Sequence, residues 1–167
     1  MKPLLISLSL LFGSTLTVAQ EGHSWSLQPL IGYNGTHQTG GYAGLEVLWN
    51  SQFGLTATYG SYSLESAGLS ATWYLTQGSN PLFLKIGGTS YWSSTDDQYR
   101  YSLRSFHAGG GYQALVFGNF TLTTDAVAIK YIRQKISIGN LKIKDFFSSD
   151  ESWYFTLGLT VGYRFTF

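Results

Sequence analysis

The chain has 167 residues, no cysteine and a formal net charge of +1. Hydrophobic residues make up 44% of it and aromatic residues 17%, but charged residues only 11%, against roughly 25% in an average protein. This length suits a single domain. The lack of cysteine excludes a disulfide scaffold and cysteine-ligated metal sites, and the even charge balance argues against nucleic-acid binding, which needs a basic surface.

The first 19 residues have the features of a secretory signal peptide. Lys2 provides a basic start, residues 4–12 form a short apolar core, and Ala19 is a small residue at the expected cleavage site. The core is too short to cross a bilayer as a helix, and no later stretch has the roughly 20 apolar residues that a spanning helix needs. We therefore predict that residues 1–19 are removed on export and that residues 20–167 form one domain. A buried N-terminal helix is the alternative.

Large apolar residues recur at every second position through the rest of the chain. Between Trp153 and Phe167, for example, they alternate with threonine, glycine and one arginine. A period of two is that of a β-strand with one apolar and one polar face. The pattern predicts eight strands, near residues 25–34, 42–49, 54–60, 68–75, 82–87, 105–114, 120–133 and 153–167.

Two of these strands carry irregularities. In the seventh, Asp125 shares a face with the apolar Val127 and Ile129, which predicts a bulge or a change of register near that point. In the sixth, the three consecutive glycines at residues 109–111 indicate relief of crowding inside a sheet rather than a phosphate-binding loop.

Side-chain size decides which face of the strands is inside. Short connections alternate with longer ones, and the strand number is even, as in an up-and-down antiparallel barrel. Eight strands enclose little volume, so the glycine- and threonine-rich face fits the interior and the bulky aromatic face does not. We therefore predict an all-β, eight-stranded antiparallel transmembrane β-barrel with its apolar face towards lipid. A secreted, lipocalin-like carrier with the opposite orientation is the alternative.

Aromatic residues near the strand ends predict two belts at the membrane interfaces. The belt on the side of the short turns is expected to contain Trp49, Phe53, Phe83, Phe117, Phe120, Phe165 and Phe167. The belt on the side of the long loops is expected to contain Tyr33, Tyr42, Tyr59, Tyr91, Trp92, Tyr131 and Trp153.

The last strand resembles the C-terminal strand of bacterial outer-membrane proteins. Phe167 is terminal, and Phe165 and Tyr163 precede it at alternating positions. The resemblance implies that these three residues are read by the barrel-assembly machinery. The chain from residue 20 onward is similar to the small eight-stranded barrels of the OmpA/OmpX type. That likeness implies a monomer in the outer membrane of a Gram-negative bacterium, in contact with lipid and lipopolysaccharide.

Several charged residues fall on the predicted inner face, namely Glu46, Lys85 and Arg164, with His107 beside them. Ions in a narrow interior are costly unless they are paired. We interpret them as a network that fixes register and fold. The resemblance to OmpA-type barrels also implies a plug or a gate for a very small channel.

The sequence gives little sign of catalysis, and no cofactor is predicted. Some similar barrels modify lipid A, and their deacylases carry a His-x-Ser pair, whereas this chain has Ser105 and His107 in the reverse order. A hydrolase needs a nucleophile within reach of a base and a path for the substrate, and no acidic third member is evident. No three-ligand metal cluster is apparent either.

The last long connection predicts a hairpin that extends the seventh and eighth strands. Two alternating runs flank Gly139 and Asn140, a sequence typical of a tight turn. The hairpin offers a sheet edge for an extracellular protein partner and lysines for lipopolysaccharide phosphates. Its residues of interest are Lys135, Ile136, Ile138, Leu141, Lys142, Ile143 and Lys144. We expect a non-enzymatic barrel with a structural or adhesive role, with a small channel as the alternative and a lipid A enzyme as the third possibility.

Overall fold

The computed structural model describes residues 24–34, 40–61, 64–76, 80–93, 99–138, 141–144 and 153–167. At residues 34, 99–100, 133–138 and 141–144 the description is limited to the backbone. The predicted signal peptide lies outside the described residues. The described part of the chain contains no helix that is long and apolar enough to cross a membrane.

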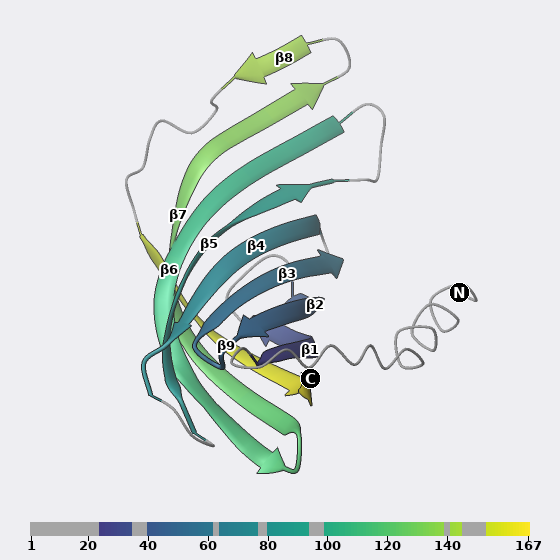
Figure 1. Ribbon diagram of the computed structural model, residues 1–167. Helices are drawn as coiled ribbons and strands as arrows, with labels where there is room; N and C mark the ends of the chain where they lie inside the picture. The colour runs from purple at the N-terminus through teal and green to yellow at the C-terminus, as the bar shows by residue number, and fades with distance from the viewer. Residues whose placement is uncertain are drawn as a thin grey trace, which may run out of the picture.

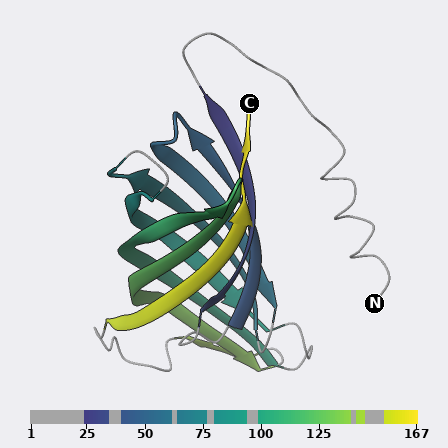
Figure 2. The same ribbon diagram turned by 90° about the horizontal axis from the view of Figure 1, so that it is seen from below.

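The strands form one antiparallel sheet that closes on itself (Figures 1 and 2). Each strand from β1 to β7 pairs with the next, and β9 closes the barrel by pairing with both β7 and β1. The short β10 continues β9 along β1, and β8 pairs with the upper part of β7, so eight strand positions surround the interior. The predicted eight-stranded barrel is confirmed. The strands are β1 Trp25–Asn34, β2 Gly40–Trp49, β3 Phe53–Ser61, β4 Glu65–Tyr74, β5 Leu82–Trp92, β6 Tyr99–Phe117, β7 Phe120–Ile138, β8 Leu141–Lys144, β9 Tyr154–Tyr163 and β10 Phe165–Thr166.

The predicted alternation sets the inside and the outside of the barrel. Phe155 and Leu157 on β9 are 77% and 73% exposed on the outer wall, whereas Thr156 between them is buried. The same alternation holds in β2, where Glu46 is buried between outward-facing Leu45 and Val47. The small or polar face therefore lines the interior, as the volume argument predicts.

Aromatic pairs occupy the end of the barrel where the short turns lie. The rings of Trp25 and Trp49 stack with centroids 6.0 Å apart, and those of Phe120 and Tyr163 meet edge to face at 4.9 Å. Four residues assigned to the aromatic belts instead face the interior, namely Phe83, Tyr42, Tyr91 and Tyr131. Phe83, Tyr42 and Tyr91 lie on the same strand faces as the inward-pointing Lys85, Glu46 and Thr89, respectively. The alternation of side chains along each strand therefore sets their direction, despite the preference of aromatic rings for the membrane interface.

The predicted irregularity at Asp125 is absent, because β7 keeps one register with β6 from Thr121 to Tyr131. The register shift lies further on, where Arg104 and Ser105 pair with Arg133 and Tyr131 and leave Ile132 as the additional residue. Asp125 therefore shares the inner face with Val127 and Ile129, which are 6% and 4% exposed. The prediction was wrong because the interior is not uniformly polar: its loop-side half buries apolar side chains.

The strands β6 and β7 have 19 residues each, whereas those from β1 to β5 have 9 to 11. Their upper parts extend past the other strands, and β8 continues this extension (Figure 1). The pairing of Ile138 with Leu141 and of Lys135 with Lys144 is that of the predicted hairpin. The two turn residues, Gly139 and Asn140, lie outside the described residues.

We expect Gly111→Ala to destabilise the barrel, whereas Gly41→Ala leaves it unchanged. A Cβ on Gly111 would lie 2.7 Å from the Phe83 ring and against the Thr124 carbonyl, whereas one on Gly41 meets nothing closer than 3.8 Å. Overpacking of this kind costs about 1–3 kcal/mol. The free energy of unfolding, measured by urea titration of the refolded protein, tests the difference. Equal unfolding midpoints for the two variants would contradict the crowding of the inner face.

Candidate functional site

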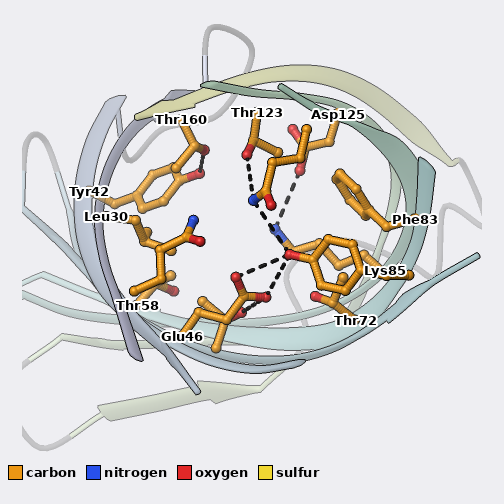
Figure 3. A pocket seen from close by; sticks show the side chains of 14 residues that line it. Leu30, Tyr42, Glu46, Thr58, Thr72, Phe83, Lys85, Thr123, Asp125 and Thr160 are labelled. Carbon is orange, nitrogen blue, oxygen red and sulfur yellow. Dashed lines mark hydrogen bonds and ion pairs between the residues drawn. The ribbon is translucent and has the colours of Figure 1, made fainter. Parts of the chain in front are cut away.

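The interior contains a small cavity at the level of Glu46 and Lys85 (Figure 3). Its volume of about 30 Å³ leaves room for roughly two water molecules. Every strand around the barrel contributes at least one polar side chain to it, and Leu30 and Phe83 add apolar surface. Side chains from all eight strand positions therefore meet in the interior at this level.

Glu46 on β2 is the most enclosed charge, with 4% of its surface exposed. The Tyr74 hydroxyl lies 3.2 Å from both carboxylate oxygens, and the Thr56 hydroxyl lies 3.4 Å from Oε1. The carboxylate fills the space that a side chain at Gly54 would need. The Tyr74 ring packs against Phe83 with centroids 5.7 Å apart, which holds the hydroxyl in place. Glu46 is thus positioned by neutral donors.

Lys85 on β5 forms an ion pair across the interior with Asp125 on β7. The Lys85 ammonium lies 3.3 Å from Asp125 Oδ2, and the two side chains are 21% and 9% exposed. The Asp125 carboxylate fits against Gly158, where a Cβ would collide with it. Asp125 was missed from the sequence because its alignment with Val127 and Ile129 pointed to the outer face. Thr121, Thr123 and Asp125 stand at every second position, and this polar series could have placed Asp125 on the inner face.

Arg164, at the C-terminal end of β9, is held by two glutamines. Its Nε donates to Gln28 Oε1 at 3.4 Å, and its guanidinium group also donates to Gln113 Oε1. The Gln113 amide donates to Thr123 at 3.1 Å and lies 3.5 Å from the Tyr74 hydroxyl. Hydrogen bonds therefore connect Arg164 through Gln113 and Tyr74 to Glu46. Both glutamines are almost fully buried, and neither was predicted as a site residue.

Three of the four predicted interior residues lie around the cavity, and the fourth lies outside it. Glu46, Lys85 and Arg164 take part in the polar contacts around the cavity. His107 also faces inward, but it lies nearer the loop end and does not line the cavity; its Nε2 is packed against Gly87. With Asp125, the polar network around the cavity carries two carboxylates and two cations, so their formal charges balance.

The Ser105 and His107 pair does not resemble an open catalytic site. Ser105 is buried, and its hydroxyl donates to the Tyr91 hydroxyl at 3.5 Å. Among the described residues, no group of three or more His, Cys, Asp or Glu side chains could hold a metal ion. The Ser105 hydroxyl is therefore engaged with a neighbouring side chain inside the barrel.

A closed eight-stranded barrel with a polar interior and an apolar outer wall is the architecture of small outer-membrane barrels. The chain is similar to the N-terminal β-barrel domain of Pseudomonas aeruginosa OprF, with a TM-score of 0.56 and 14% identity over 85% of this chain and 97% of that one. It is also similar to a major outer membrane protein from Thermus thermophilus, with a TM-score of 0.53 and 11% identity over 86% of this chain and 100% of that one. No family model and no curated protein sequence matches. The predicted likeness to such barrels is confirmed for the fold.

We expect Asp125→Ala to lower the free energy of unfolding by about 3 kcal/mol, because it leaves the Lys85 ammonium without its partner in a confined interior. The double variant K85M/D125L replaces the ion pair with apolar groups of similar size, and we expect it to return to within about 1 kcal/mol of the wild type. Urea titration followed by tryptophan fluorescence measures both. An unchanged unfolding midpoint for Asp125→Ala would show that the ion pair does not stabilise the barrel.

Proposed function

We propose that this protein is an integral, non-enzymatic β-barrel of a Gram-negative outer membrane, exported by residues 1–19 and active through its surface-exposed loops. The observation that carries the proposal is the outer wall, which exposes large apolar side chains such as Ile31, Leu157 and Phe155 around a closed barrel. Apolar surface on this scale is stable only when it is removed from water. Lipid is the environment that suits a barrel exposing it on every side.

The dimensions of the barrel support this location. Each strand residue advances about 3.3 Å and barrel strands tilt by about 40°, so the ten residues of β9 rise about 25 Å. This matches the apolar band of about 25 Å that outer-membrane barrels present to lipid. Trp153 and Tyr163 stand at its two ends, where interfacial aromatic residues are expected. Phe165 and Phe167 complete the alternating aromatic end that we propose as the assembly signal.

The hairpin of β7 and β8 supports a role in surface interaction. It lies at the loop end of the barrel, and β8 pairs with β7 alone among the described strands. The other edge of β8 therefore offers backbone groups to an added strand from an extracellular protein. The side chains that fill the interior at the level of Glu46 favour this role over the small channel, and the buried Ser105 favours it over a lipid A enzyme.

Heat-dependent migration on a detergent gel is the experiment that tests the membrane barrel. We expect the unboiled protein, extracted from outer membranes, to migrate differently from the boiled protein, because small folded barrels resist the detergent. Leu159→Arg places a charge near the middle of the lipid-facing wall and should cost about 2–4 kcal/mol of folding free energy. Ser102→Arg, beyond the apolar band, is the control and should cost less than about 1 kcal/mol. Recovery in the soluble fraction without a gel shift would contradict the proposal.

Deletion of residues 136–143 is expected to abolish adhesion of cells that produce this protein to protein-coated surfaces, while the gel shift is retained. The pairs that close the barrel join β9 to residues 120–129 of β7, which lie outside this segment, so the fold should survive. Adherent cells are counted for the wild type, the deletion variant and a strain without the protein. Wild-type adhesion by the deletion variant would show that the hairpin is not the interaction surface.

A further inference from the structure

Two cations lie close together on the outer wall of the barrel near its loop end. Arg104 on β6 is exposed, and its neighbours Leu103 and Ser105 are buried in the interior, so its side chain points outward. Lys130 on β7 also faces outward, and its cross-strand partner is Phe106. Arg104 and Lys130 are therefore diagonal neighbours on one face, with backbones about 7–8 Å apart.

The described carboxylates do not neutralise these cations. Glu46 and Asp125 are inside the barrel, and Glu65 accepts a hydrogen bond from the Trp92 indole. Neither Arg104 nor Lys130 forms an ion pair with any carboxylate of the described residues. Among the described residues, the outer wall thus carries two neighbouring positive charges without a carboxylate partner.

The height of these cations matches that of a lipid headgroup. The Lys130 ammonium lies 5.8 Å from the centre of the Trp153 ring. Trp153 stands at the loop end of the apolar band, opposite Tyr163 at the turn end. Indole rings concentrate where headgroups meet acyl chains. A phosphate at this depth would face Arg104, which can bind two of its oxygens, and Lys130, which adds a point charge.

A strip of small residues runs from this position towards the middle of the wall. Ala108 pairs with Ala128, and Gly110 pairs with Ala126, all on the outer face. Larger side chains border the strip, with Leu84 and Ile86 on β5 and Phe155 and Leu157 on β9. The high exposure of Phe155 and Leu157 follows from the small size of these neighbours.

We propose that this wall of β6, β7 and β9 binds one phosphorylated lipid of the outer leaflet, of the lipid A class. Arg104 and Lys130 bind its phosphate, and an acyl chain lies along Ala108, Gly110, Ala126 and Ala128. The two cations lie at the membrane interface, and the strip of small residues lies next to them, deeper in the apolar band. A lipid has the same order, with its phosphate at the interface and its acyl chains below. The inference rests on the proposed membrane location and names a specific ligand site on that wall.

Native mass spectrometry of the refolded protein in detergent tests the proposal. Bis-phosphorylated lipid A and lipid A stripped of both phosphates are titrated separately into each variant. We expect R104Q/K130Q to weaken binding of the phosphorylated lipid about tenfold or more and to leave the stripped lipid unaffected. The charge-preserving control R104K/K130R keeps both cations at the site and should bind the phosphorylated lipid like the wild type.

A second pair of variants tests the strip. A126L/A128L should weaken binding of both lipids, whereas A57L/A71L, which adds the same volume to the outer wall on β3 and β4, should weaken neither. Equal binding of the two lipids by the wild type, or a loss in R104K/K130R equal to that in R104Q/K130Q, would overturn the site. The heat-dependent gel shift is recorded for every variant. A wild type without the shift would refute the membrane location itself, whereas a shift without phosphate discrimination would refute only the lipid site.

Discussion

The narrow interior of an eight-stranded barrel is the constraint on which the rest of this structure depends. It accommodates mainly glycine, serine and threonine, with a few longer polar side chains and a few apolar ones such as Leu48 and Val127, so the bulky half of most strands faces outward. Where a long side chain does enter, a glycine on a neighbouring strand makes room for it. Gly54 lies against the Glu46 carboxylate, and Gly158 lies against that of Asp125. Inner glycines and inner charges therefore depend on one another.

The charges around the cavity balance, and Lys85, Arg164 and Tyr74 each donate to an acceptor across the interior. Lys85 and Asp125 bridge β5 and β7, and Arg164 joins the closing strand to β1 and β6 through glutamines. Glu46 is held by hydroxyl groups rather than by an ion pair. These contacts cross the barrel between strands far apart in sequence, so they also define which strands can close it. The same contacts leave space for only about two waters.

The outer wall differs from one side of the barrel to the other. The long strands β6 and β7 extend it at the loop end, where β8 adds a further edge (Figure 1). The same two strands carry the cations Arg104 and Lys130 and the strip of small residues below them. The proposed interaction surface and the proposed lipid site are thus built from one pair of strands, which share the most extensive pairing among the described strands.

Strand period and side-chain size were sufficient to derive from the sequence the eight strands, the closed barrel and its inside-out polarity. Both are local properties of each strand. They also placed Glu46, Lys85 and Arg164 on the inner face. Tertiary structure decided the rest: that Asp125 is the partner of Lys85 and that Gln28 and Gln113 hold Arg164. These facts depend on which strands face one another across the interior, and that relation appears only when the sheet closes.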